Sequence, residues 1–116
     1  MSRHVLAVDL KDDPHVIAAY VEHHRQVWPE VLRSLRAAGI DDMEIVLLGR
    51  RLVMIVVASG DVASALAAHS SSSPQVAQWE ALMKSMQEPP PANAAGEWWA
   101  TMTPIFRLNA AEPCPI

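Results

Sequence analysis

Residues 43–58, MEIVLLGRRLVMIVVA, contain two β-rich runs, MEIVLL at 43–48 and LVMIVVA at 52–58. The link between them at 49–51, Gly-Arg-Arg, has the length and the glycine of a hairpin loop. Both runs are almost continuously apolar, whereas a strand with one solvated face alternates apolar and polar residues. The stretch therefore predicts a β-hairpin in a sheet that is apolar on both faces.

The residues before this hairpin predict a strand and a broken helix. Residues 4–10, HVLAVDL, include an apolar run typical of a strand. The Asp-Pro pair at 13–14 is a helix start, with a side-chain acceptor at the N-cap and a preset φ at the first helical position. Because Pro29 removes a backbone N–H and crowds the preceding turn, we expect a kink or break near residues 25–28 and a second helical piece over 29–38.

The residues after the hairpin predict helices, a loop and a strand. Residues 61–69 are alanine-rich and helical in pattern, and four serines at 70–73 separate them from a second helix over 74–86. Residues 87–97 contain three prolines and predict a loop, and loops this long in small domains are usually functional or interfacial. Residues 100–108, ATMTPIFRL, predict a last strand, whose proline favours an edge or bulge position.

The resulting order, βαββαβ, predicts an α+β ferredoxin-like fold, with two helices on one face of a four-stranded antiparallel sheet. The other apolar face is then uncovered, and large exposed apolar patches are rare on soluble monomers. We therefore expect a homodimer in which two sheets close into a dimeric α/β barrel. A single ferredoxin-like domain is expected over residues 4–108, with a C-terminal tail at 109–116.

Composition excludes several classes of protein. The chain has 116 residues, 51% of them hydrophobic, which suits one domain with its own core. A net charge of −4 leaves no basic stripe, so no nucleic-acid partner is expected. No apolar run approaches the roughly 20 residues of a membrane span, so no membrane partner is expected, and acidic residues stand where a signal peptide would be apolar. The single cysteine, Cys114, suggests a reducing compartment, and we expect a cytoplasmic protein.

The candidate functional residues are a histidine and several tryptophans. Four of the six aromatic residues are Trp, a residue often used where an apolar face and a polar N–H are both needed. His24 lies four residues after Tyr20 and four before Trp28, on one helical stripe. That stripe is equally consistent with a polar pocket and with core aromatics capped by an imidazole. In the segment Glu97-Trp98-Trp99, which opens the last predicted strand, one Trp is expected to face a pocket while the other packs.

Metal and cofactor chemistry has little support in the sequence. The five histidines and one cysteine form no His-x-x-x-His, His-x-His or Cys-x-x-Cys pattern. Four glycines provide no phosphate-binding loop. We therefore expect modest proton transfer by a side chain, without a metal or cofactor.

Residues 20–32, YVEHHRQVWPEVL, resemble the signature of the L-rhamnose mutarotase family: Tyr, three residues, His, three residues, Trp-Pro-Glu. The resemblance covers about residues 4–108. It continues through residues 36–40, 42–45, 78–83 and 105–108. It implies a dimeric α+β barrel that interconverts the α and β anomers of a 6-deoxy-L-hexose, L-fucose or L-rhamnose, without cofactor or metal.

By this resemblance, His24 matches the acid/base position and Tyr20 a substrate-contacting tyrosine. Trp79 matches the first residue of a Trp-Trp pair that binds the sugar, whereas the second is Glu80 here. A tyrosine of the rhamnose-acting members is replaced by Met43, which leaves the sugar open. Of the other tryptophans, Trp28 and Trp99 are further candidates for sugar contact.

Two other functions remain open on the residues. A cofactor-free monooxygenase would share the dimeric ferredoxin-like architecture but would need an extended pocket for an aromatic substrate. A non-catalytic binding dimer would use the tryptophans for a ligand and leave His24 without a chemical role.

Overall fold

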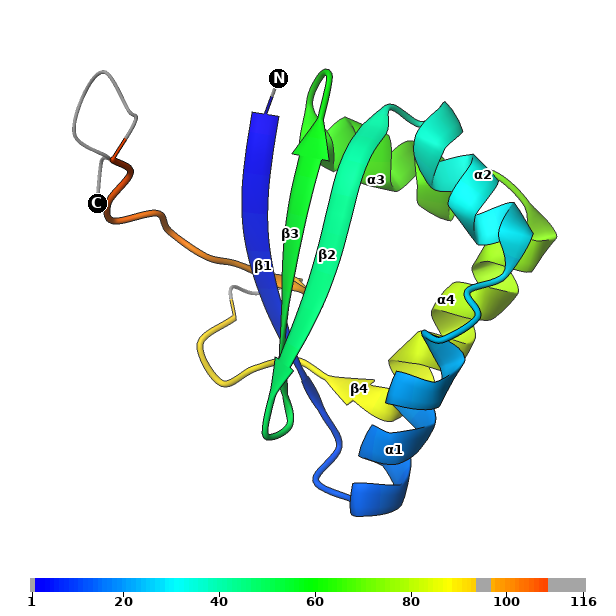
Figure 1. Cartoon of the computed structure of the whole chain (residues 1–116), viewed down its shortest axis with the longest axis vertical. Helices are drawn as coiled ribbons and strands as arrows, with labels where there is room; N and C mark the ends of the chain where they lie inside the picture. Colours follow the sequence, from blue (N-terminus) through cyan, green and yellow to red (C-terminus); the bar gives the residue numbers. More distant parts are fainter. Residues whose placement is uncertain (1, 94–96, 109–116) are drawn as a thin grey trace.

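The protein is an antiparallel sheet with helices packed against one side, and the computed structural model describes residues 2–93 and 97–108 (Figure 1). The elements in chain order are β1 (Ser2–Leu10), α1 (Pro14–His23), α2 (Pro29–Ala37), β2 (Ile40–Leu48), β3 (Arg51–Ala58), α3 (Val62–Ser70), α4 (Pro74–Met86), β4 (Gln87–Glu88) and β5 (Ala100–Thr101).

The strand order is β2-β3-β1-β4, with β5 also paired to β1, and every pairing is antiparallel. This order and the one-sided helices confirm the predicted α+β ferredoxin-like fold. The fourth strand position is divided, because β4 pairs with Asp9 and Leu10 whereas β5 pairs with Leu6 and Ala7. Both short strands therefore lie along the same edge of β1.

The helices begin and break where the sequence predicts. The Asp13 side chain accepts a hydrogen bond from the His15 backbone N–H at 2.9 Å, and Pro14 is the first helical residue. Helix α1 ends at His23, and α2 restarts at Pro29 after five non-helical residues, which confirms the break. Because the break begins at His24, the C-cap residue, that side chain is placed at the open end of α1.

Three expectations about strands need correction. β2 starts at Ile40, three residues earlier than predicted, with an irregularity in the ladder between Ile40 and Asp42. The predicted loop 87–97 opens with the two residues of β4, and the predicted strand 100–108 is reduced to the two residues of β5. The last ladder bond joins Met102 N–H to the Val5 carbonyl at 2.8 Å.

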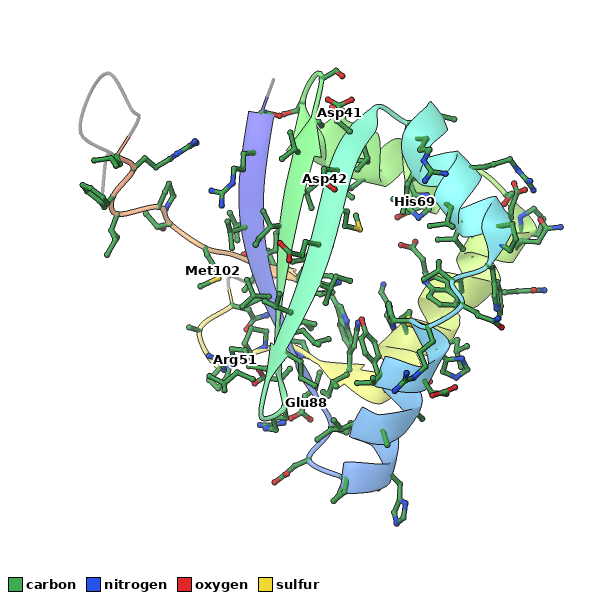
Figure 2. All side chains as sticks on the ribbon, viewed as in Figure 1. Asp41, Asp42, Arg51, His69, Glu88 and Met102 are labelled. Atoms are coloured by element: carbon green, nitrogen blue, oxygen red, sulfur yellow. The ribbon has the colours of Figure 1, made fainter. Side chains whose placement is uncertain are left out.

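The chain leaves the sheet just before Pro104, which has no N–H to donate. Beyond it, Ile105 and Phe106 are each 74% exposed. Figure 2 shows Met102, at the start of this segment, on the side of the sheet away from the helices, and His69 on the helical side. The predicted tail at 109–116 lies outside the described residues.

The core lies between the helices and the inner sheet face. Along β3, Leu52, Met54 and Val56 are buried, whereas the alternate residues Val53 and Ile55 are only partly buried. Since successive residues of a strand point to opposite faces, the outer face is also apolar, as predicted. The helices of the described residues all lie on the inner side (Figure 1).

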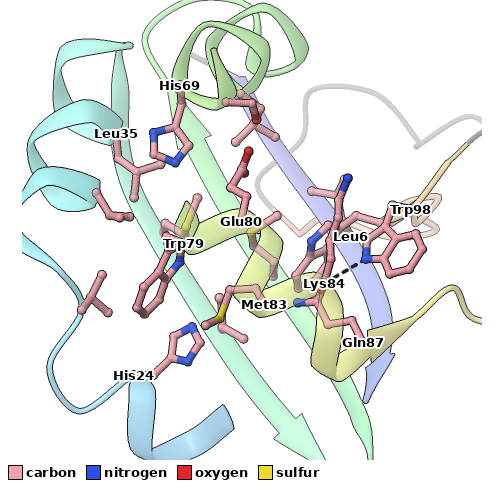
Figure 3. Close-up of a pocket in the computed structure, with 18 of the residues that line it drawn as sticks. Leu6, His24, Leu35, His69, Trp79, Glu80, Met83, Lys84, Gln87 and Trp98 are labelled. Carbon is pink, nitrogen blue, oxygen red and sulfur yellow. Dashed lines mark hydrogen bonds between the residues drawn. The ribbon is translucent and has the colours of Figure 1, made fainter. Parts of the chain in front are cut away.

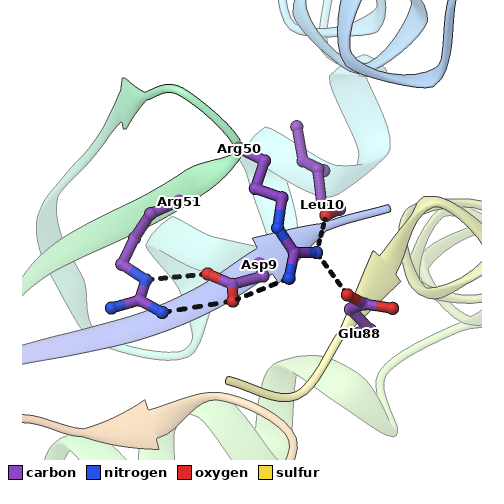
Figure 4. A network of polar contacts seen from close by, with 5 residues as sticks. All are labelled: Asp9, Leu10, Arg50, Arg51 and Glu88. Atoms are coloured by element: carbon purple, nitrogen blue, oxygen red, sulfur yellow. Dashed lines mark hydrogen bonds and ion pairs between the residues drawn. The ribbon is translucent and has the colours of Figure 1, made fainter. Parts of the chain in front are cut away.

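A cluster of ion pairs around the buried Asp9 carboxylate ties the end of β1 to the hairpin and to β4 (Figure 4). The Asp9 carboxylate accepts from Arg51 Nε at 2.7 Å and lies 3.8 Å from an Arg50 guanidinium nitrogen. Arg50 also donates to the Leu10 carbonyl and pairs with Glu88 of β4. The hydrogen bond from Arg51 holds the pKa of Asp9 below its ordinary value, against the opposing effect of burial.

Replacing Asp9 with Asn should lower the thermal unfolding midpoint at pH 7, because two guanidinium groups lose their shared carboxylate. A lowered pKa in the folded state gives stability that is complete above the unfolded value of about 4 and is lost as the pH falls through the folded value. The midpoint of Asp9→Asn should therefore depend less on pH in acid than that of the wild type, when unfolding is followed by circular dichroism. Glu22→Gln on α1, which removes an exposed ion pair with Arg25, is the control and should change neither property.

Candidate active site

A cavity of about 580 Å³ lies between the inner face of the sheet and the helices (Figure 3). Its volume falls in the ~300–1,000 Å³ range of small-molecule sites. The sheet provides an apolar floor, formed by Leu6, Met43, Ile45 and Met54. Polar groups enter from the helices and from the segments that follow them, so a ligand would meet an apolar floor and a polar wall.

His24 lies against two aromatic rings of the cavity wall. Its ring centroid is 4.4 Å from that of Tyr20 and 5.5 Å from that of Trp79. Its Nδ1 lies 2.8 Å from the Tyr20 carbonyl oxygen, which can only accept, so Nδ1 carries the proton. Nε2 is therefore the basic nitrogen of a ring that lines the cavity.

The environment of His24 favours the neutral imidazole. Burial lowers its pKa from the ordinary 6.5, the hydrogen bond to the Tyr20 carbonyl opposes this shift, and the neighbouring His23 adds to it. At neutral pH the ring is consequently unprotonated at Nε2. A neutral imidazole at a cavity wall can act as a general base.

Tyr20 belongs to a chain of side-chain hydrogen bonds. Trp98 Nε1 donates to Gln87 Oε1 at 2.8 Å, and Gln87 Nε2 donates to the Tyr20 hydroxyl oxygen at 3.1 Å. Burial raises the pKa of Tyr20 to about 12, so the phenol stays protonated at any ordinary pH. Sequence reasoning missed Gln87, which falls within the predicted loop and lies 67 positions from its partner Tyr20.

The tryptophans divide between the cavity and the packing behind it. Trp79 is 6% exposed and lines the cavity, and Trp28 packs against it with ring centroids 5.2 Å apart. Trp28 is not among the described residues that line the cavity, so the structure places it behind the wall. Trp98 and Trp99 both line the cavity, which corrects the expectation that only one would. The reason is that they lie in a bend before β5, where strand alternation does not apply.

A second imidazole, His69 at the end of α3, also lines the cavity. Ser72 Oγ donates its one proton to the His69 carbonyl at 2.7 Å, so in its 2.6 Å contact with Ser34 the Ser34 hydroxyl donates. His69 Nδ1, 2.7 Å from Ser34 Oγ, must then be the donor in that bond. His69 thus also presents Nε2 as its basic nitrogen.

The surroundings of His69 include one carboxylate. Burial lowers the pKa of His69, and the charge of Glu80 partly opposes this shift. In the view of Figure 3, Trp79 lies between His24 and His69, and Glu80 extends from α4 into the same cavity. The cavity therefore has hydrogen-bond acceptors at two separated places. Sequence reasoning found no signal for His69 among the five histidines, because Ser34, the partner of its imidazole, comes from α2 and lies 35 positions away.

Within residues 2–93 and 97–108, no cluster of three His, Cys, Asp or Glu side chains is placed to hold a metal ion. Within the same ranges, no helix has the length and apolar character needed to cross a membrane.

Comparison with known proteins identifies the family. The family model described as "L-rhamnose mutarotase" matches residues 3–108. The chain belongs to the L-rhamnose mutarotase family. This family membership confirms the resemblance seen in the sequence around His24.

Individual relatives of this mutarotase family member agree in sequence and fold. The L-fucose mutarotase of Xanthomonas campestris pv. campestris is 42% identical over 114 residues, which cover 96% of this chain and 91% of that protein. The crystal structure of an L-rhamnose mutarotase from Formosa agariphila matches with a TM-score of 0.68 and 22% identity, over 93% of this chain and 99% of that one. Tetracenomycin F2 cyclase from Streptomyces glaucescens shares the fold with a TM-score of 0.61 and 16% identity, over 95% and 99% of the two chains.

Replacing Ser34 with Ala should destabilise this mutarotase by about 1–3 kcal/mol, because the buried Nδ1–H of His69 loses its acceptor. Urea unfolding followed by fluorescence measures the loss. Ser85→Ala is the matched control, since that exposed hydroxyl donates only to the Leu82 carbonyl of its own helix. Equal stability of the Ser34 and Ser85 variants would contradict the buried hydrogen bond between Ser34 and His69.

Proposed function

We propose that this protein is an aldose mutarotase that interconverts the α and β anomers of a 6-deoxy-L-hexose, with His24 as the general acid/base. The observation that carries the proposal is the tautomer of His24. The Tyr20 carbonyl holds its Nδ1–H, and a lowered pKa keeps Nε2 unprotonated at neutral pH, so that it can accept a proton. Membership of the L-rhamnose mutarotase family supports the same reaction.

The reaction requires one base and one acid. His24 Nε2 takes the proton of the anomeric hydroxyl, the electron pair of that O–H bond forms the carbonyl, and the bond from C1 to the ring oxygen breaks. A proton donor gives a proton to the ring oxygen as this bond breaks. The aldehyde then rotates about its bond to C2, and the same groups act in reverse to close the ring on the other face.

Indole rings suit the apolar side of a pyranose. Trp79 lines the cavity beside His24, and Trp99 lines it from the segment before β5. The C–H face of a 6-deoxy sugar packs on such rings, while its hydroxyls meet the polar wall. On the side away from His24, the sugar hydroxyls would donate hydrogen bonds to His69 and Glu80.

Two sugars, L-fucose and L-rhamnose, are the proposed substrates. The 42% identical relative is named for L-fucose, and the family is named for L-rhamnose. Both sugars are 6-deoxy-L-hexoses that expose the same reacting hemiacetal. We expect exchange with L-fucose to be the faster, in accordance with the higher identity to the fucose relative.

His24→Ala should reduce enzymatic anomer exchange by about 10²–10⁴-fold, because it removes the only proton acceptor proposed for the anomeric hydroxyl. Saturation-transfer NMR on equilibrated L-fucose and L-rhamnose, run in parallel, measures the rate. His15→Ala, an exposed histidine on the same helix, should retain wild-type exchange. Wild-type protein that accelerates exchange of neither sugar would overturn the proposed function.

The pH dependence of exchange follows from the lowered pKa of His24. The neutral ring is the active form, so kcat/KM should be flat at neutral pH. It should decline only as the pH falls below the ordinary value of 6.5. A decline that is already half complete at pH 6.5 or above would contradict the buried, neutral imidazole.

We also propose that the protein is a homodimer formed through the outer face of the sheet. Because Val5 pairs with Ile55 across the ladder, their side chains share this face. On β2 the exposed side chains include Val46 at 44% and Leu48 at 85%. These residues form an apolar surface on the side without helices (Figure 1), and a second copy has the chemistry to cover it.

Ile55→Glu should convert the dimer to a monomer, because it places a second carboxylate directly opposite Glu44 on this surface, where the like charges repel and lose solvent on association. Light scattering after size exclusion at micromolar concentration measures the mass. Val21→Glu adds the same charge to an apolar residue that is 40% exposed on α1, and it should remain dimeric. A monomeric wild-type protein would contradict the proposal.

We propose a cytoplasmic location for this enzyme. The support is the composition, with a single cysteine in 116 residues, which suits a reducing compartment.

A further inference from the structure

The hydrogen-bond chain that ends at Tyr20 has a fixed direction. An indole N–H donates and cannot accept, so the partner of Trp98 Nε1 must be the carbonyl oxygen of the Gln87 amide. The orientation of the Gln87 amide is thereby set, and its NH₂ group faces Tyr20. At 3.1 Å the Gln87 NH₂ donates to the Tyr20 hydroxyl oxygen, which therefore accepts.

This direction determines where the Tyr20 proton points. A phenol has one proton, and a donor already occupies the side of the hydroxyl that faces Gln87. The O–H bond must consequently point away from Gln87. Tyr20 and Gln87 both line the cavity, so the cavity is where the Tyr20 hydroxyl finds an acceptor.

We propose that Trp98 and Gln87 are positioning residues that fix Tyr20 as the hydrogen-bond donor to the pyranose ring oxygen. The inference rests on the proposed mutarotase function and names the acid that complements His24. The two reacting oxygens of the sugar are bonded to the same carbon, so acid and base must be neighbours. Tyr20 and His24 meet this requirement, with ring centroids 4.4 Å apart.

The proton transfers balance. His24 Nε2 accepts the anomeric proton as C1=O forms, and Tyr20 gives its proton to the ring oxygen as the C1–O bond breaks. On closure the ring hydroxyl returns a proton to the phenolate, and the imidazolium returns one to the new anomeric oxygen. The Gln87 N–H bond to the phenol oxygen stabilises the negative charge that develops on Tyr20.

The fold supports both Gln87 and Trp98 in this series of hydrogen bonds. Gln87 is 3% exposed, and it belongs to β4, where it pairs with Leu10 of β1. The next residue, Glu88, pairs with Arg50. At the other end, the Lys84 ammonium lies 5.6 Å from the centroid of the Trp98 ring. The Gln87 amide is therefore supported by its own backbone, and the indole by a cation–π contact.

Gln87→Glu tests the direction of these hydrogen bonds, because Glu has almost the same size and shape as Gln. A carboxylate accepts from Trp98 and also from Tyr20, so the phenol proton turns away from the cavity. We expect kcat for anomer exchange to fall about 10²-fold or more, with KM changed much less. Gln78→Glu makes the same change at an exposed position of α4 and should leave kcat unchanged.

A spectroscopic readout separates positioning from general structure. Tyr20 is the only tyrosine in the chain, so its Raman Fermi doublet reports this one hydroxyl. In sugar-free protein, Gln87→Glu should shift the doublet toward a phenol that donates strongly to a carboxylate. Trp98→Phe, which frees the Gln87 amide to turn, is the second variant if Gln87→Glu does not fold. It should broaden the doublet and lower kcat about tenfold.

The outcomes distinguish the two proposals. Inactive wild-type protein overturns both the proposed function and the positioning role of Trp98 and Gln87. An active wild type together with wild-type kcat in Gln87→Glu, or an unchanged Raman doublet in both variants, overturns only the assignment of Gln87 and Trp98. A lower kcat with the expected doublet shift and native circular dichroism supports it.

Discussion

The pairing of the last residues of β1 with β4 is the constraint on which the site depends. Through the ladder, Leu10 stands opposite Gln87 and Asp9 opposite Glu88, which fixes where α4 ends relative to the sheet. The buried Asp9 carboxylate and the two arginines of the hairpin hold that corner together (Figure 4). Because α4 carries Trp79 into the cavity, the position of this corner also sets the width of the site.

The parts of the fold that sequence predicts are those decided by neighbouring residues. An Asp before a Pro begins α1, and Pro29 begins α2 after a break. The hairpin follows from two apolar runs around Gly49, whose φ of +62° suits glycine in the turn. The divided fourth strand was not predictable, because β4 and β5 have two residues each. Strands this short show no hydrophobic pattern, and each of them pairs only with β1.

The site shows the same division between local and distant causes. His24 caps the helix that carries Tyr20 four residues earlier, so spacing alone brings their rings together. Gln87 and His69 depend on partners from distant elements, Tyr20 in one case and Ser34 in the other. Their burial follows from tertiary packing, and no periodicity in the sequence indicates it. The structure therefore adds the hydrogen-bond partners around the cavity to the residues that the motif already suggested.

The divided fourth strand has a consequence for how substrate preference can change. Trp98 and Trp99 stand immediately before β5, and the Asn93 side chain holds the Glu97 carbonyl at 2.8 Å just ahead of them. Insertions or deletions between Glu88 and Ala100 would change the position of Trp98 and Trp99, while β4 and β5 each stay paired with β1. If these tryptophans contact the sugar as proposed, substrate preference can change through this one connection, while His24 and the sheet beneath the cavity stay as they are.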